Sequence, residues 1–228
     1  MNKLPPITKN LLIINVLCWM GTMAMAKYGI DLHKLLGLHF FLAPSFKIWQ
    51  LITYMFLHEG FQHLFFNMFA VWMFGRIMEM QWGSNRFLLF YLICGIGAGL
   101  TQELFQFVQY EITLSGFDPI TPEVVHALRV YMNAILTVGA SGAVYGILLG
   151  YGMTFPDNQL FIIPIPFPIK AKWLVVGYVV IELVLGLKNS AADNVAHFAH
   201  LGGMLAGFLM ILYWRHKERK DNHIKFTW

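Results

Sequence analysis

Apolar residues gather in six long stretches along this chain, and most of the polar residues lie between them. The stretches cover about residues 10–29, 56–78, 87–108, 132–153, 172–188 and 196–214. A helix needs about 20 apolar residues to cross the hydrocarbon core, and the short fifth stretch fits a tilted helix or a thinner bilayer. Lipid offers no partners for backbone polar groups, so each stretch is expected to be helical. The pattern predicts an all-α fold, a polytopic membrane bundle with six transmembrane helices.

Two of the connecting segments have a character of their own. Residues 30–55 are rich in aromatic residues and leucine, too irregular to span and too apolar for water, which predicts an interfacial element in the outer leaflet. Residues 154–171 form a helix-breaking inner loop that contains Pro156, Pro164, Pro166 and Pro168. We find no internal repeat, and we expect a single membrane domain over 1–228 with a short cytoplasmic tail at about 215–228.

Composition agrees with a membrane protein. Hydrophobic residues make up 57% of the chain and charged residues 12%, against about 25% charged residues in soluble domains. The net charge of +4 forms no basic stripe among exposed aromatic residues, so nucleic-acid binding is not expected. Cys18 and Cys94 both lie in apolar stretches and do not indicate a disulfide framework.

The distribution of positive charge predicts the orientation. With the N-terminus inside, eleven of the 16 Lys and Arg residues fall in inner segments, and the outer segments hold Lys27, Lys34, Lys47, Arg129 and Lys188. Both termini are therefore expected in the cytoplasm, in a bacterial inner membrane. Ala24-Met25-Ala26 resembles a signal-peptidase site, but five further stretches follow, which favours a retained first span. Either alternative places residue 27 outside.

Polar side chains inside apolar helices are costly to bury, so they are the first candidates for function. Ser141 lies in Gly139-Ala140-Ser141-Gly142, near the start of the fourth stretch. A serine in a membrane helix usually serves packing or a backbone hydrogen bond. The flanking glycines allow close approach of a substrate and leave backbone N–H groups free to face an oxyanion.

Two histidines begin the sixth stretch, His197 and His200, in Ala196-His197-Phe198-Ala199-His200-Leu201-Gly202-Gly203. Gly203 and Gly207 form a small-residue face that lets this helix approach another closely. His200 lies three residues before Gly203, on the same face, and is therefore expected to point at a neighbouring helix, as a general base must.

A third polar cluster opens the second stretch. His63 and Asn67 are four residues apart and share a helix face, with His58 just before them. A metal site built from His58, His63, His197 and His200 is the competing interpretation. No companion carboxylate resembles the general base of a metal hydrolase motif, and Asn67 is a poor zinc ligand, so we expect no metal.

Depth favours one shared site. The second, fourth and sixth stretches all run from outside to inside in the predicted topology. His63, Ser141 and His200 each fall in the first half of their stretch. The three clusters are therefore expected at one level, in the outer half of the bilayer.

These motifs together resemble the rhomboid family of intramembrane serine proteases over nearly the whole chain. The matching segments are HxxxxHxxxN at 58–67, GxSG at 139–142, AHxxGxxxG at 199–207 and GxxxExxxG at 75–83. Each motif alone is weak, but all four occur on the expected spans.

The resemblance implies a role for each residue. Ser141 would be the nucleophile, and His200 the general base that then protonates the leaving amine. His63, Asn67 and the Ser141 backbone N–H would form the oxyanion hole. Tyr145 matches the tyrosine that stacks on the catalytic histidine. The family uses a dyad, and the sequence offers no evident carboxylate to complete a triad.

Supporting roles follow from the same resemblance. His58 would support the second-stretch cluster, and His197 would be a neighbour of the base. No cofactor is implied. The expected partners are the lipid bilayer and transmembrane substrates with a single span, small residues at the cut and a locally weak helix. The physiological substrate, its cleavage site and the oligomeric state cannot be deduced from the sequence.

Several features depart from the family pattern or are left without a role. Where the family often carries Trp-Arg, this chain has Trp49-Gln50, which weakens any inference about polar anchoring of that loop. The outer segment 109–131 has no evident function. Glu79 is expected to cap or pair at the inner end of the second stretch, with Arg76 or Arg86 nearby. Glu182 is expected to be a hydrogen-bonded interior acid, with substrate gating as the alternative.

Two other kinds of protein remain to be distinguished from a serine protease. A catalytically inactive relative that binds membrane clients would typically lack the serine or the histidine, yet Ser141 and His200 are both present. A metal-dependent membrane enzyme or ion pathway built on the histidines would be sensitive to a chelator.

Overall fold

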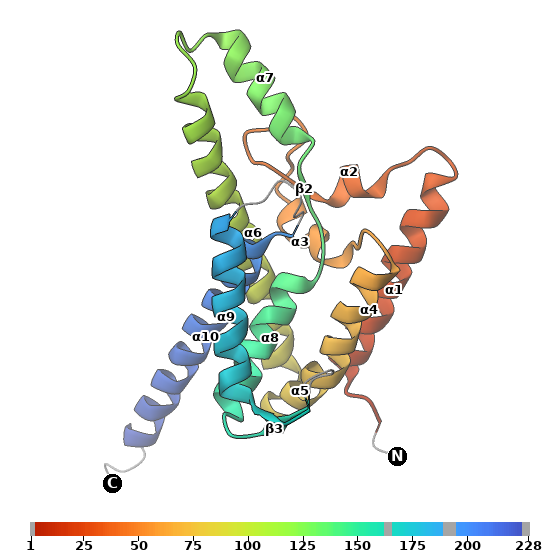
Figure 1. Ribbon diagram of the computed structural model, residues 1–228. Helices are drawn as coiled ribbons and strands as arrows, with labels where there is room; N and C mark the ends of the chain where they lie inside the picture. The colour runs from red at the N-terminus through yellow and green to blue at the C-terminus, as the bar shows by residue number, and fades with distance from the viewer. Residues whose placement is uncertain (1–2, 162–165, 189–194, 225–228) are drawn as a thin grey trace.

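The computed structural model describes residues 3–161, 166–188 and 195–224, so the predicted loop residue Pro164 lies outside the described residues. The described chain is mostly helical and contains almost no sheet, which confirms the predicted all-α class (Figure 1). The helices are α1 (Pro6–Ala26), α2 (Leu32–Leu36), α3 (Gln50–Thr53), η1 (Tyr54–Phe56), α4 (Phe61–Ala70), η2 (Val71–Gly75), α5 (Arg76–Trp82), α6 (Ser84–Leu114), α7 (Pro122–Asn133), α8 (Ser141–Thr154), α9 (Ala171–Lys188) and α10 (His197–Ile224). Two-residue strands form β1 (Leu38–His39) with β2 (Leu136–Thr137) and β3 (Gln159–Leu160) with β4 (Ile169–Lys170).

Most of the first, third, fifth and sixth predicted stretches is covered by α1, α6, α9 and α10, whereas the fourth stretch is interrupted over 134–140 by a turn, β2 and the turn before Ser141. Among the described residues, three helices are long and apolar enough to cross a membrane: α1, α6 and α10 over His197–Lys220. The second stretch falls on α4, the π-helical η2 and α5, whereas α8 has 14 residues and α9 carries Lys172, Glu182 and Lys188. The count of six spans therefore stays a prediction.

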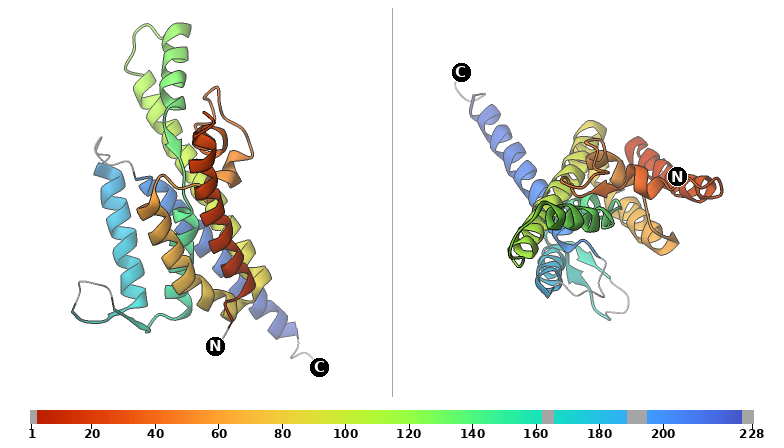
Figure 2. Two further views of the ribbon diagram at one scale, coloured as in Figure 1. Left: turned by 90° about the vertical axis from the view of Figure 1, so that its right-hand side faces the viewer. Right: turned by 90° about the horizontal axis from the view of Figure 1, so that it is seen from above.

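Helix α8 lies inside the bundle, in contact with α6, α9 and α10. Both chain ends lie at the same end of the molecule, as seen in Figure 1 and in the left view of Figure 2. That arrangement fits termini on one side of a membrane, and which side it is stays a prediction. In the view from above, α9 lies at the edge of the bundle (Figure 2). Its buried residues are Ala171, Glu182 and Gly186.

Glycines on one face of α8 bring this helix very close to α6 and α10. A Cβ atom at Gly142 would overlap Ala98 of α6, and one at Gly146 would overlap Cys94. Larger side chains fill the space beside these contacts, including the fully buried Phe90 and Tyr91 of α6. Small residues at such spacing let backbones approach and gain close van der Waals packing, which is the main source of helix association in lipid.

The segment between α1 and α4 is anchored by polar contacts. Gln50 is almost fully buried, its Oε1 accepts the Lys47 N–H at 3.0 Å, and its Nε2 donates to the Leu35 and Ser45 carbonyls at 3.3 and 3.2 Å. Gln50 thus supplies polar anchoring of this segment, which the sequence resemblance did not predict. Pairing of β1 with β2 joins this segment to the chain just before α8.

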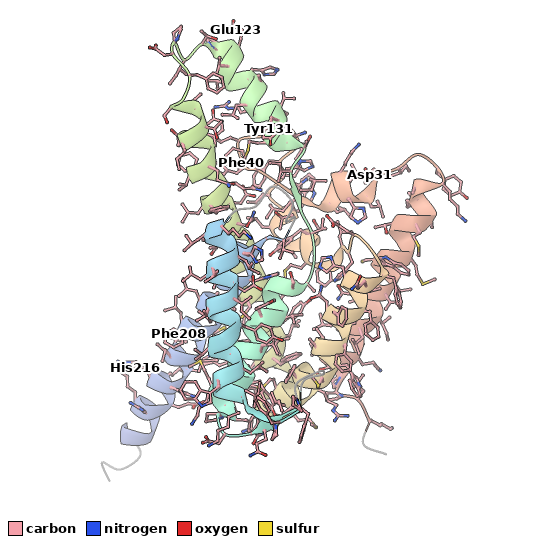
Figure 3. All side chains as sticks on the ribbon, viewed as in Figure 1. Asp31, Phe40, Glu123, Tyr131, Phe208 and His216 are labelled. Atoms are coloured by element: carbon pink, nitrogen blue, oxygen red, sulfur yellow. The ribbon has the colours of Figure 1, made fainter. Side chains whose placement is uncertain are left out.

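Residues 109–131, which the sequence predicted to lie outside, form a helical hairpin from the end of α6 and most of α7. It rises beyond the rest of the bundle, with Glu123 near its tip and Tyr131 further down α7 (Figure 3). Its inner face packs Tyr110, Leu128 and Met132 around Phe40. The hairpin therefore covers the segment that follows β1.

Glu79 of α5 fastens α1 to the bundle. Its carboxylate accepts the Ile7 and Thr8 backbone N–H groups at 2.9 and 2.7 Å, the Thr8 hydroxyl at 2.8 Å and the Ser84 hydroxyl at 2.7 Å. It therefore caps the first turn of α1, where backbone N–H groups have no partner within the helix. The cap is one of the two expected roles; Arg86 instead pairs with Glu218 at 2.7 Å.

We expect Glu79→Gln to lower the thermal stability, because an amide replaces a charged acceptor of four hydrogen bonds. Burial raises the pKa of Glu79, but the hydrogen bonds from Ser84, Thr8 and Ile7 outweigh it and hold that pKa below its ordinary value. The stabilisation is present above the unfolded pKa of about 4.3 and is lost as pH falls through the lower folded pKa. A loss of about 1–2 kcal/mol at pH 7 is expected, measured by thermal unfolding in detergent. The exposed Glu111→Gln is the control, and equal stability of the two variants would contradict the cap.

Candidate active site

Ser141 is the first residue of α8 and stands at the end of a tightly constrained turn. Gly139 has φ +126°, a conformation that favours glycine, and its N–H donates to the Tyr54 carbonyl at 2.9 Å. A Cβ at Gly139 would also lie 2.7 Å from the His63 ring. The turn therefore sets Ser141 at a helix N-terminus, where backbone N–H groups are free of intrahelical partners.

His200 approaches Ser141 from the first turn of α10. Its Nε2 lies 2.8 Å from Ser141 Oγ, a normal hydrogen-bond distance. The backbones of the two helices touch beside this pair, because a Cβ at Gly203 would overlap the carbonyl of Gly142. Gly207 lies further along α10 against Phe90 and Cys94. The predicted small-residue face thus brings serine and histidine together.

Tyr145 fixes the plane of the His200 ring. The two rings are stacked, with centroids 4.2 Å apart and an angle of 8° between their planes. Tyr145 is one turn after Ser141 on α8, so the same helix supplies the hydroxyl and the surface that supports the imidazole. This contact leaves His200 little freedom to rotate away from Ser141.

The serine and histidine share a cavity of about 350 Å³. Its lining comes from η1, the loop before α4, the first turn of α4, the Ser141 turn and the start of α10. It includes Tyr54, Glu59, His63, Gly139, Ser141, Gly142, Ala199 and His200. A second cavity of about 490 Å³ lies alongside and is lined by Glu59, Gly60, Gln62, His63, Phe66 and Asn67. His63 therefore faces both cavities, while among the described lining residues Asn67 belongs to the second.

His58 lies behind this wall. It is fully buried, and its ring packs edge-on against His63 with centroids 5.0 Å apart. Its backbone carbonyl lies 3.3 Å from His33 Nε2. His58 therefore packs against the His63 side chain, and its supporting role stays a prediction.

A carboxylate also reaches the site, so the expectation that none accompanies the serine and histidine is wrong. Glu182 Oε2 of α9 lies 3.0 Å from His200 Nδ1 and 2.6 Å from His197 Nδ1. Its Oε1 accepts the Tyr145 hydroxyl. The His200 N–H is not aligned with the carboxylate, so this contact has an ion-pair distance without hydrogen-bond geometry.

The same residues are the group among the described side chains that could hold a metal ion. The ligand atoms of Glu182, His197 and His200 lie within 4.8 Å of one another, and all three residues are buried. This set differs from the four-histidine set considered from the sequence. The 2.6 Å contact between Glu182 and His197 is a charge-assisted hydrogen bond, which already satisfies the carboxylate without an ion.

Comparison with known proteins shows which family this chain belongs to. The family model described as the Rhomboid domain matches residues 45–217. The chain belongs to the rhomboid family. Among curated rhomboid relatives, it is 33% identical over 162 residues to Rhomboid protease GluP of Bacillus subtilis (strain 168), covering 70% of this chain and 25% of that protein.

Other relatives come from different organisms. Identity is 32% over 162 residues with RHOMBOID-like protein 6, mitochondrial, of Arabidopsis thaliana, covering 71% of this chain and 42% of the relative. It is 30% over 180 residues with Rhomboid protease AarA of Providencia stuartii, covering 76% and 59%. This rhomboid therefore spans less than two thirds of the length of each of these relatives.

Glu182 is the site residue whose place the sequence did not reveal. The available signal was an acid inside an apolar stretch, four residues before Gly186, and it predicted only a hydrogen-bonded interior acid. Gly186 packs against His197 and Phe198, which turns this face of α9 toward the start of α10. That rotation depends on contacts between helices and leaves no mark on local spacing.

We expect Gly203→Ala to destabilise this rhomboid, because the new methyl group would overlap the Gly142 backbone, which cannot yield as a side chain can. Overpacking of this kind costs about 1–3 kcal/mol. Thermal unfolding in detergent should show a lower midpoint. Gly177→Ala on α9 is a matched control, since nothing lies within 4 Å of a Cβ there. A midpoint unchanged in Gly203→Ala would show that α8 and α10 are not in backbone contact.

Proposed function

We propose that this protein is an intramembrane serine protease that cleaves peptide bonds in or near transmembrane helices of membrane-protein substrates with a Ser141–His200 dyad. The observation that carries the proposal is the 2.8 Å contact between Ser141 Oγ and His200 Nε2 inside a cavity, with Tyr145 stacked on the imidazole. Family membership and the printed names of GluP and AarA, which are rhomboid proteases, support it.

The chemistry follows from the positions of the two groups. Ser141 Oγ attacks the scissile carbonyl carbon while its proton passes to His200 Nε2. Collapse of the tetrahedral intermediate breaks the C–N bond, and the proton on His200 goes to the leaving amine. Water then attacks the acyl-enzyme and gives a proton to His200 Nε2, the ester C–O bond to Ser141 breaks, and the proton returns from His200 to Ser141 Oγ. Every proton moves through one nitrogen, so no cofactor is required.

The oxyanion that forms in the intermediate needs hydrogen-bond donors. His63 faces the cavity that holds Ser141, and the Ser141 backbone N–H lies at the free end of α8. Asn67 is one helical turn after His63 and lines the adjoining cavity. We assign the three groups to the oxyanion hole, with His63 nearest and Asn67 behind it.

The substrate and setting are inferred from the family resemblance and the surface. The helices expose many large apolar side chains, such as Phe65 and Leu104, which fits a lipid bilayer as the surroundings. A client with a single span, small residues at the cut and a locally weak helix would enter from the lipid. We place the protein in a bacterial inner membrane with both termini in the cytoplasm.

We expect Ser141→Ala and His200→Ala each to abolish cleavage of a model transmembrane substrate without unfolding the protein. Each loss should equal that of the double variant, because the two residues act as a unit. Labelling by a serine-directed fluorophosphonate should occur in the wild type and disappear in Ser141→Ala. His197→Ala should keep substantial activity, since its Nδ1 points to Glu182. Near-normal turnover by Ser141→Ala, or activity in His200→Ala but not in His197→Ala, would refute the dyad.

For the oxyanion hole, we expect His63→Ala and Asn67→Ala to lower kcat far more than they raise KM. The negative oxygen exists in the intermediate and not in the ground-state amide, and each donor is worth about 10²–10³ in rate. Gln62→Ala is the matched control, because Gln62 lines the second cavity on the same helix but not the Ser141 cavity. Thermal stability is measured beside turnover. A stable variant with unchanged kcat would remove that residue from the oxyanion hole, and activity lost in proportion to stability would indicate a packing role.

A further inference from the structure

Glu182 is a buried acid that the Ser141–His200 mechanism does not use, although it lies beside the base. It is 4% exposed, and it is one of the few residues of α9 that face the bundle. Three rings from two other helices converge on its carboxylate: Tyr145 from α8, and His197 and His200 from α10. An acid in the interior of a membrane protein is costly unless such donors compensate its charge.

We propose that Glu182 is a positioning residue for the proposed protease, holding His200 in the tautomer with its proton on Nδ1 and stabilising the imidazolium formed during catalysis. The inference rests on the proposed Ser141–His200 reaction. Glu182 would thus extend the dyad of this chain to a Ser–His–Glu arrangement.

The positions of the two carboxylate oxygens support this assignment. Oε1 accepts from Tyr145, whose ring also stacks on His200, so one residue orients both the acid and the base. Oε2 accepts from His197 Nδ1, because a carboxylate can only accept. The same oxygen lies 3.0 Å from His200 Nδ1, on the side of the imidazole opposite to Ser141.

The two groups beside His200, Ser141 and Glu182, indicate which ring nitrogen carries the proton when the imidazole is neutral. Nε2 must be unprotonated to accept the Ser141 hydroxyl proton, so the neutral ring carries its proton on Nδ1, toward Glu182. When Nε2 takes the serine proton, the ring gains a positive charge 3.0 Å from a buried carboxylate. Charge attraction does not require alignment, and catalytic hydrogen bonds often tighten only when substrate is bound. Glu182 keeps its charge throughout and exchanges no proton.

A purely structural role is the competing account, in which Glu182 only ties α9 to α8 and α10. The two accounts differ in what depends on His197. If the carboxylate only links α9 to α10 through its hydrogen bond with His197, then His197→Ala should lower kcat as much as Glu182→Gln does. If it acts on His200, Glu182→Gln should be much worse.

The decisive experiment compares kcat and KM of Glu182→Gln, His197→Ala and Glu103→Gln on a model transmembrane substrate in detergent. Glu103 is a matched control, a buried acid on α6 whose carboxylate accepts the Phe41 N–H at 2.7 Å. In soluble serine proteases, the corresponding Asp→Asn change lowers kcat about 10⁴-fold. Because the contact here is not aligned, we expect a fall in kcat of at least about 10²-fold for Glu182→Gln, with KM little changed. His197→Ala and Glu103→Gln should stay within about tenfold of wild type.

The second readout is the ¹⁵N NMR signal of the His200 ring nitrogens, which a purely structural tie would not change. Wild-type protein should carry the proton on Nδ1, and Glu182→Gln should shift the population toward Nε2, since an amide can offer its own N–H to Nδ1. Wild-type protein with its proton on Nε2 would overturn the proposal even if Glu182→Gln fails to fold. So would near-normal kcat in Glu182→Gln, or equal losses in Glu182→Gln and His197→Ala.

Two further arms separate this inference from the proposed function and from a metal site. Ser141→Ala is assayed in parallel: cleavage by that variant would refute the dyad, while the tautomer measurement would still decide whether Glu182 orients His200. Wild-type enzyme is also assayed with excess EDTA. Loss of activity that zinc restores would make Glu182, His197 and His200 metal ligands and overturn the proposal.

Discussion

The site depends on one close contact between helices, the approach of α8 to α10 at Gly142 and Gly203. No side chain separates the two backbones there, so the distance between Ser141 and His200 is set by main chain against main chain. Backbone contacts of this kind are stiff, whereas a contact between long side chains can adjust by rotamer changes. The glycines facing Ala98 and Cys94 hold α6 against the same pair. Three helices thus fix the separation on which a proton transfer relies.

The polar groups of the site come from different helices, and they contact one another through ring stacking and hydrogen bonds. Tyr145 supports the plane of His200 and donates to Glu182, and Glu182 accepts from His197 at the start of α10. In an apolar interior, an unpaired polar group is costly, so polar side chains that contact one another in this way have few alternative arrangements. The same reasoning explains Glu79, whose hydrogen bonds fasten α1 at the other end of the bundle.

Spacing along the chain predicted the features that depend on one helix at a time. His200 on the glycine face, Tyr145 one turn after Ser141, and His63 beside Asn67 all follow from 3.6 residues per turn. The sequence did not reveal that Glu182 meets His200, that Asn67 lines an adjoining cavity, or that Gln50 anchors its loop. These contacts depend on how far each helix is rotated and shifted against its neighbours. That rotation is set by many small packing contacts, so no short motif encodes it.

Much of α9 faces away from the bundle, with Val176, Val180 and Leu187 exposed and Glu182 turned inward. Its attachment at mid-height is therefore electrostatic more than it is hydrophobic. A sideways displacement of α9 would withdraw the carboxylate from Tyr145, His197 and His200 in a single movement. The orientation of the imidazole is therefore tied to the position of α9, because the acid beside it belongs to a helix with few buried side chains.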